Sequence, residues 1–120
     1  MKIKTAEATE LQLDWLVAKC EGRPELHDFG KIIPWTTKLA PADQRGQRFF
    51  PSTNWSQGGP IIERERINIR DEVTQWASWM WDSTKAGDVS YFGPTPLIAA
   101  MRCFVASKLG DEVEVPDELA

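Results

Sequence analysis

Residues 95–110 read TPLIAAMRCFVASKLG, and they carry the clearest helix signals in the chain. Thr95 is a favourable N-cap, Pro96 suits the first helical position, and Gly110 follows the last apolar residue as a stop signal. Large apolar side chains occupy one face of this helix and small side chains another, which allows neighbouring elements to approach closely. We therefore expect this helix to be the spine of the fold.

A second helix is indicated near the N-terminus. Thr9 is the expected N-cap of a helix over residues 10–21, which Gly22 ends and Pro24 follows. Apolar side chains occupy most of its circumference and leave only narrow polar edges. This helix is therefore expected to be covered on two sides.

The sequence between these helices favours short antiparallel strands. Apolar and polar residues alternate over residues 67–70 and again over 74–81, as they do in strands. These two strands are expected to form a hairpin around the polar connection Asp71-Glu72. A polar loop over residues 82–88 is expected to follow.

The remaining segments carry weaker signals. A further short strand is expected over residues 89–92. Residues 23–57 contain four prolines and read as loops with short strands, of which 31–35 is the best candidate. Pro60 suits a first helical position and predicts a short helix over 60–66. The acidic residues 111–120 are expected to form an extended, partly mobile tail.

These elements predict an α+β fold in which a small antiparallel sheet packs against an N-terminal and a C-terminal helix. The length of 120 residues suits one domain over residues 1–120.

The composition excludes several classes of protein. Fourteen basic against eighteen acidic residues give a net charge of −4, so we expect no general binding to nucleic acid. The chain shows neither a signal peptide nor the run of roughly 18 apolar residues that a membrane span needs, so a cytoplasmic protein is expected. Cys20 and Cys103 lie in apolar helical contexts and are expected to be reduced and buried.

Signals for catalysis and metal binding are weak. His27 is the only histidine and lies in a predicted loop near Glu25 and Asp28, with no nucleophile beside it. Walker A, Rossmann, His-Glu-x-x-His and EF-hand motifs are absent. We therefore assign no catalytic residue, no metal ligand and no cofactor.

Two segments, Gly58-Gly59-Pro60 and Gly93-Pro94-Thr95-Pro96, place small residues and proline directly before predicted helices. Helix starts present unpaired N–H groups and partial positive charge, which suit phosphate or carboxylate. The alternative is that these residues only mark helix boundaries.

Three arginines are candidates for neutralising an anionic ligand. Arg102 is the only charge between Pro96 and Ser107, and its alternative role is an ion pair with a residue such as Glu63 or Glu65. Arg64 and Arg66, with Arg70 nearby, could form a phosphate-binding fork, or a solvated face interleaved with glutamates.

The aromatic residues are also unusual, since the chain has six tryptophans. Trp55 follows the polar residues Thr53 and Asn54, where it could stack on a nucleobase or pack against the hairpin. Strand alternation splits the tryptophans of residues 76–81 over both faces, so at least one should meet a partner subunit or a pocket. This pattern favours a homo-oligomer.

Five phrases of the sequence resemble the NinX-like proteins of tailed phages and prophages. They are MKIKTAE (1–7), DWLVAKCEG (14–22), PSTNWSQGGPIIERE (51–65), TPLIAAMR (95–102) and GDEVEVP (110–116). Residues 23–50 and 69–92 depart from the pattern. The resemblance implies a small accessory phage protein encoded among non-structural genes, in a family of unknown function.

Our leading hypothesis is that the protein is a non-enzymatic sponge for a nucleotide-derived immune signal, of the cyclic dinucleotide or cyclic ADP-ribose type, which counters host defence. It requires both helix starts to face one shared hollow. The candidate ligand-binding residues are Thr53, Asn54, Trp55, Gly58, Gly59, Arg64, Arg66, Thr95 and Arg102.

Two alternatives remain open. The chain could be a protein-interaction module that inhibits a host or phage protein through a Trp-rich surface. It could also be a nuclease or phosphodiesterase of the same ligands, with His27 and nearby carboxylates as acid-base groups.

Overall fold

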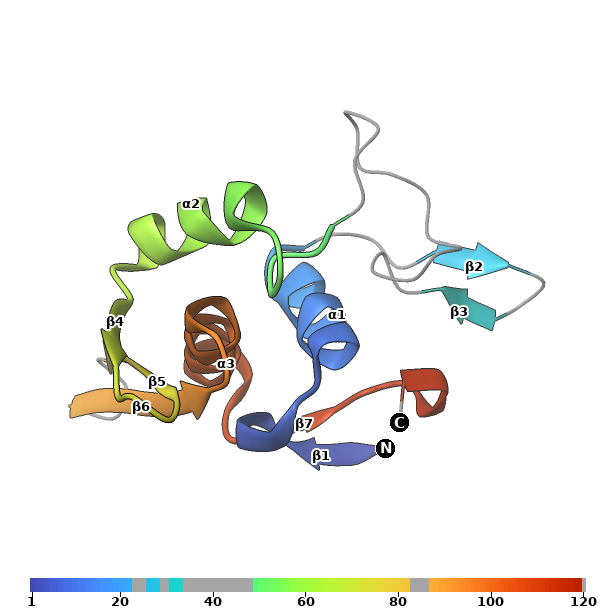
Figure 1. The fold of residues 1–120 in the computed structure, drawn as a ribbon. Coiled ribbons are helices and arrows are strands. Elements are labelled where there is room, and N and C mark those ends of the chain that lie inside the picture. Colours follow the sequence, from blue (N-terminus) through green and yellow to red (C-terminus); the bar gives the residue numbers. More distant parts are fainter. Residues whose placement is uncertain (23–25, 29–30, 34–48, 83–86, 120) are drawn as a thin grey trace.

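The structure, a computed structural model, describes residues 1–22, 26–28, 31–33, 49–82 and 87–119. Its described part is an α+β fold with small antiparallel sheets, as the sequence predicts. Helix α3 lies at the centre, with α1 on one side, α2 on another and a three-stranded sheet on a third (Figure 1).

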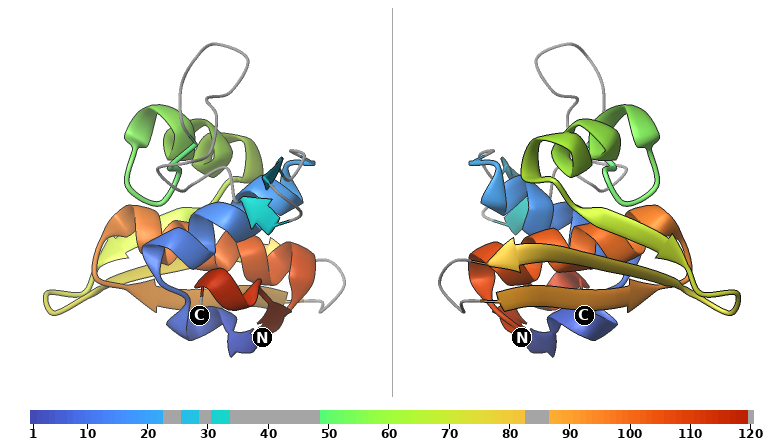
Figure 2. Two further views of the ribbon diagram at one scale, coloured as in Figure 1. Left: turned by 90° about the vertical axis from the view of Figure 1, so that its right-hand side faces the viewer. Right: turned by 90° about the vertical axis from the view of Figure 1, so that its left-hand side faces the viewer.

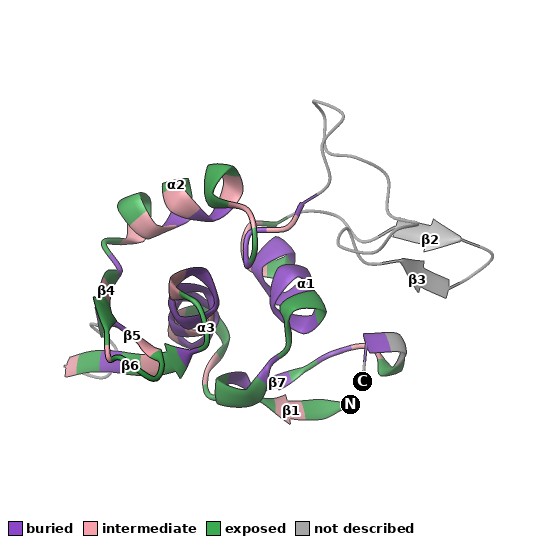
Figure 3. Cartoon of the chain, viewed as in Figure 1, coloured by how far each residue is buried: buried purple, intermediate pink, exposed green. Residues whose placement is uncertain are grey.

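Helix α3 (Pro96–Leu109) begins and ends where its sequence signals place it. The Thr95 hydroxyl accepts a hydrogen bond from the Ile98 N–H at 3.1 Å, and Gly110 ends the helix at a positive φ of 95°. Nearly every residue from Leu97 to Ala106 is buried, with Arg102 the exception (Figure 3). The small side chains allow helices and strands to surround α3.

Helix α1 (Glu10–Cys20) also confirms its prediction, one residue shorter. Thr9 forms a capping box with Gln12, whose Oε1 accepts from the Thr9 N–H at 2.9 Å. The polar residues Gln12 and Asp14 of α1 are buried. Gln12 is covered where its amide donates to the Leu119 carbonyl, and Asp14 is covered where its carboxylate accepts the Ser52 N–H.

The three-stranded sheet has the order β4-β5-β6 and is antiparallel throughout. It comprises β4 (Asn68–Asp71), β5 (Trp76–Asp82) and β6 (Gly87–Gly93). The predicted hairpin is confirmed, although Asp71 belongs to the strand, where it pairs with Trp76. Strand β6 is longer than the expected 89–92 and begins inside the predicted loop, because its first residues pair with the end of β5.

Helix α2 (Trp55–Glu65) corrects the short helix expected over 60–66. The Asn54 side chain caps it by accepting the Ser56 N–H at 2.9 Å, so Pro60 lies inside the helix. Proline inside a helix removes one hydrogen bond and brings its ring against the carbonyl four residues earlier, and here that cost falls in a helix that packs on α3. The helix ends at Arg66, which adopts the left-handed conformation with a φ of 55°.

The chain ends meet in a second sheet, where β1 (Lys2–Lys4) pairs with β7 (Glu112–Glu114). The 3-10 helices η1 (Thr5–Glu7) and η2 (Asp117–Leu119) flank it. The mobility expected of residues 111–120 stays a prediction, but Val113, Val115 and Leu119 in this segment are buried.

A third pair of strands consists of β2 (Leu26–Asp28) and β3 (Lys31–Ile33). Strand β3 confirms the start of the strand expected over 31–35, and residues 34–35 lie outside the described residues. The loop expected around His27 is wrong, because His27 pairs with Ile32 in this hairpin.

Candidate functional site

The predicted helix start at Gly58-Gly59-Pro60 is wrong, because these residues lie inside α2. The Gly58 N–H is used within the helix, where it donates to the Asn54 carbonyl at 2.8 Å. A Cβ at Gly58 would lie 2.4 Å from the Pro51 carbonyl oxygen and 2.6 Å from the Leu97 Cδ2. Gly58 therefore permits close packing of α2, and it does not present its N–H to a ligand at a helix start.

The two segments expected to face one hollow are separated by packed atoms. Gly58 lies against Leu97 at the start of α3, and both Leu97 and Pro51 are buried. The three helices do begin at the same end of the molecule (Figure 2, left). Their alignment supplies partial positive charge at that end, while among the described residues Gly58 itself is in close contact with Pro51 and Leu97.

The actual start of α2 keeps Trp55 accessible. Trp55 is the first residue of α2 and is 54% exposed, so it is not buried against the hairpin. Asn54 uses its side chain as the N-cap, and exposed Thr53 donates its N–H to the Phe50 carbonyl. Their ligand-binding roles stay predictions.

Arg64 and Arg66 lie at the other end of α2. Arg64 forms ion pairs with Glu21 at 2.7 Å and Glu65 at 2.9 Å, and these hydrogen bonds raise the pKa of its guanidinium. Arg66 is exposed and forms the C-cap. The structure thus interleaves Arg64 with glutamates, and it separates both arginines from Trp55 by the length of the helix.

Arg102 lies at the centre of a different arrangement. Its Nε and Nη2 donate to the Ala8 carbonyl at 3.3 and 2.9 Å, and its Nη1 donates to the Phe92 carbonyl at 2.8 Å. The ion pair considered with Glu63 or Glu65 does not form, and Glu65 instead pairs with Arg64 and Lys108. Burial lowers the pKa of the Arg102 guanidinium from its usual value.

Two hollows adjoin Arg102 and are both bordered by Pro94. The larger, of about 470 Å³, is here called the Arg102 groove. Its lining residues are Ala6, Thr74, Gln75, Ser90, Tyr91, Phe92, Gly93, Pro94 and Arg102. The smaller hollow, of about 400 Å³, lies between the starts of α1 and α3. The predicted site residue Thr95 directly follows Pro94 in the chain, but its hydroxyl caps α3 by accepting the Ile98 N–H.

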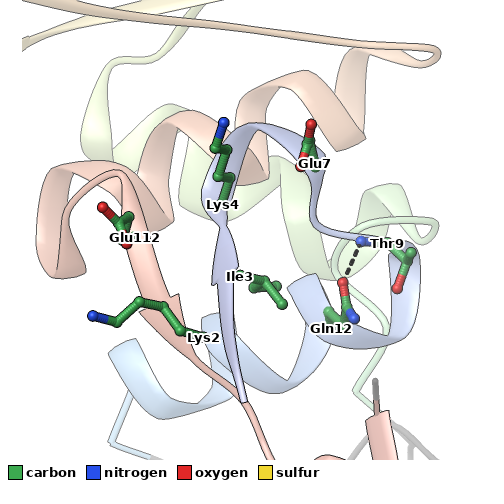
Figure 4. A pocket seen from close by; sticks show the side chains of 7 residues that line it. All are labelled: Lys2, Ile3, Lys4, Glu7, Thr9, Gln12 and Glu112. Carbon is green, nitrogen blue, oxygen red and sulfur yellow. Dashed lines mark hydrogen bonds between the residues drawn. The ribbon is translucent and has the colours of Figure 1, made fainter.

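A further hollow of about 480 Å³ lies beside β1 (Figure 4). Lys2 and Lys4 of β1 line it together with Glu7 and Glu112. The two glutamates offset the charge of the two lysines, so this hollow suits an anion less well than the Arg102 groove does. No motif in the sequence predicts a site at these residues.

Among the described residues, no three His, Cys, Asp or Glu side chains gather as metal ligands would. No helix in the described part of the chain has the length and apolar character that crossing a bilayer requires. The side chain of His27 lies outside what is described.

Comparison with known proteins identifies the family. The model of the Bacteriophage P22 NinX family matches residues 4–108, which is most of the chain. The chain belongs to the NinX family. No curated protein matches it significantly. Because the function of the NinX family is unknown, any function for this member must be argued from its own geometry.

Proposed function

We propose that this NinX-family chain is a non-enzymatic binding protein of the host cytoplasm that captures a small phosphorylated nucleotide in the Arg102 groove. The ligand class is a nucleotide-derived immune signal, such as a cyclic dinucleotide or a cyclic ADP-ribose isomer, and its sequestration would counter host defence. The observation that carries the proposal is the half-buried Arg102 guanidinium, which donates to carbonyls and forms no ion pair among the described residues, although the Glu7 carboxylate is near enough to raise its pKa against the effect of burial.

The electrostatics of Arg102 favour an anion. Carbonyl groups satisfy donors without cancelling the charge, and a partly desolvated cation gains more from a phosphate than an exposed one does. Three of the five N–H donors of the guanidinium go to Ala8 and Phe92, so two remain for a ligand.

The shape and lining of the groove suit a nucleotide. A volume of about 470 Å³ lies within the usual range for small-molecule sites. Phe92 is 46% exposed at the groove and offers a ring on which a base could stack, worth roughly 1–3 kcal/mol. Thr74, Gln75 and Ser90 add hydroxyl and amide groups that could bind sugar or base edges.

Calorimetry against a panel of cyclic dinucleotides and cyclic ADP-ribose isomers tests the proposal. We expect one ligand to bind more tightly than about 10 µM, and Phe92→Leu to weaken it about tenfold or more through lost stacking. Trp81→Leu removes an exposed aromatic residue outside the groove and serves as the matched control. Absence of binding across the panel, or an unchanged affinity in Phe92→Leu, would refute the groove as the site.

The earlier candidate at Trp55 is tested in the same series. If Trp55→Leu abolishes binding and Phe92→Leu does not, capture occurs at the start of α2. Recovery of intact ligand after long incubation would argue against phosphodiesterase activity, and steady conversion would overturn the non-enzymatic proposal.

A protein-interaction module is the second candidate. Trp55 and Trp81 are both exposed, at 54% and 65%, and Trp is enriched at binding hot spots. A stoichiometric protein partner recovered from host lysate, with no small molecule released on denaturation, would favour this function.

A further inference from the structure

The outer face of the three-stranded sheet is left open. The inner face packs on α3, where Met80 and Val89 are buried and the Ser78 hydroxyl donates to the Ala99 carbonyl at 2.6 Å. No described element covers the opposite face, which Figure 2 (right) shows in front of α3. Strand register places eight residues on that face, and we call its five charged and aromatic members the sheet-face patch: Arg70, Trp79, Trp81, Asp88 and Phe92.

The patch is aromatic, and two of its rings are open to water. Trp81 is 65% exposed and Phe92 is 46% exposed. The Arg70 guanidinium lies over the half-buried Trp79 ring, with its carbon 5.5 Å from the ring centroid. Adjoining exposed aromatic residues mark interaction sites, and Trp and Arg are enriched at binding hot spots.

The two charges of the patch lie at diagonally opposite corners. Arg70 on edge strand β4 is level with Ala77, whereas Asp88 on edge strand β6 is level with Trp81. These levels are four residues apart along β5, or about 13 Å. The patch therefore has a positive corner at Arg70 and a negative corner at Asp88. Its aromatic residues Trp79, Trp81 and Phe92 lie between these two corners.

This arrangement is complementary to itself. A symmetric dimer buries the same patch on both copies, so each positive corner needs a negative corner at the symmetry-related position. Two copies can face each other across a two-fold axis that lies between their sheets, with the strands of one sheet crossing those of the other. In this arrangement Arg70 of each copy meets Asp88 of the partner subunit, which gives two equivalent ion pairs. The same arrangement leaves Trp79 and Phe92 near the axis, and orthogonal packing of two sheets is a known geometry.

We propose that the sheet-face patch binds the same patch of a second copy of this chain, with Arg70 paired to Asp88 of the partner subunit. The present ion pair of Arg70 with Glu72 is exposed and of little energetic value, so it can be exchanged. This proposal is argued without the ligand-capture function, but both use the exposed Phe92 ring, so a stacked ligand and the dimer would compete for it.

Sedimentation velocity on the purified full chain provides the test. The wild type should form dimers as concentration rises, and Arg70→Glu or Asp88→Arg alone should weaken dimerisation about tenfold or more by placing like charges together. The double variant Arg70→Glu/Asp88→Arg exchanges the charges and should restore dimerisation to near the wild-type level. Glu112→Lys, a charge reversal on β7 outside the patch, is the matched control.

Each outcome decides the proposal. Circular dichroism and thermal unfolding verify that the variants fold. A wild type that stays monomeric up to about 1 mM overturns the proposal, because a contact weaker than that has no use as a dimer. Dimers that neither single variant weakens, or that the charge exchange does not restore, overturn the pairing of Arg70 with Asp88.

Discussion

Asp14 is the most unusual residue in the described core. It is 2% exposed, and its Oδ1 accepts the Ser52 N–H at 2.8 Å, which ties α1 to the segment before α2. Burial raises the pKa of this carboxyl from 3.8 to about 7, and the hydrogen bonds from Ser52 oppose that shift. Near neutral pH the protein therefore exists with Asp14 partly protonated.

This raised pKa predicts a pH dependence of stability with a definite sign. The contribution of Asp14 is fully present below pH 4 and is lost as pH rises towards 7, because the unfolded state releases the proton first. Relative to Asp14→Asn, the unfolding free energy of the wild type should fall by about 2–4 kcal/mol between pH 4 and pH 8. Urea unfolding of both proteins across this pH range measures how their difference in unfolding free energy changes with pH. Any packing cost of the amide in Asp14→Asn that does not depend on pH drops out of this change.

Glu65 supplies the opposite control. Burial raises its pKa, but hydrogen bonds from Arg64 and Lys108 outweigh burial and lower the pKa overall. The stability that Glu65 contributes is therefore lost as pH falls. Relative to Glu65→Gln, the unfolding free energy of the wild type should therefore decrease as pH is lowered, which is the opposite of the trend for Asp14. Identical pH trends for the Asp14 and Glu65 variants would contradict at least one of the two assignments.

Within helix α2, Gly58 and Gly59 make a matched pair for testing how the helix packs. Gly→Ala inside a helix usually stabilises by up to about 1 kcal/mol. At Gly59 the added Cβ would meet Trp55 Cε3 at an ordinary 3.9 Å. The following Pro60, however, disfavours helical backbone for a residue with a Cβ, so Gly59→Ala should change stability by less than about 1 kcal/mol. Gly58→Ala should instead destabilise by about 1–3 kcal/mol, because its Cβ would overlap the Pro51 backbone. Urea unfolding of both variants measures the contrast, and equal effects would mean that α2 does not pack as described.

The same helix shows where local sequence signals end. Helix α3 was predictable because its cap, its first proline and its terminal glycine are adjacent to the residues they act on. The start of helix α2 is mispredicted because Gly58, Gly59 and Pro60 have the local pattern of a helix boundary, whereas in the structure the helix begins at Trp55 and Gly58 packs against Pro51 and Leu97. Tertiary packing overrides local helix propensity when an element is covered by a distant part of the chain.

At the scale of the whole molecule, the candidate site was only partly predictable for the same reason. Arg102 was identified because it is a lone charge on an apolar helix. Phe92 reaches the groove from β6, and Thr74 and Gln75 reach it from the turn between β4 and β5, a combination that no local pattern specifies. Trp55 and Arg64 are close in sequence but lie at opposite ends of α2, so nearness in the chain gave a misleading grouping.

The closure of the chain ends leads to a last prediction. The Met1 ammonium donates to the Val115 carbonyl at 2.6 Å, and the buried Gln12 side chain donates its Nε2 to the Leu119 carbonyl at 2.9 Å. Deleting residues 111–120 would expose the apolar surface beneath Val113, Val115 and Leu119 and leave the Gln12 amide without its acceptor.

We expect this deletion to destabilise the protein by about 3 kcal/mol or more, as judged from thermal and urea unfolding. The control is Glu112→Gln with Glu114→Gln, which removes exposed charges and keeps the strand paired, and it should change stability by less than about 0.5 kcal/mol. A deletion as stable as the wild type would show that residues 111–120 are the loosely held tail that their acidic composition suggests, and that the core is complete without them.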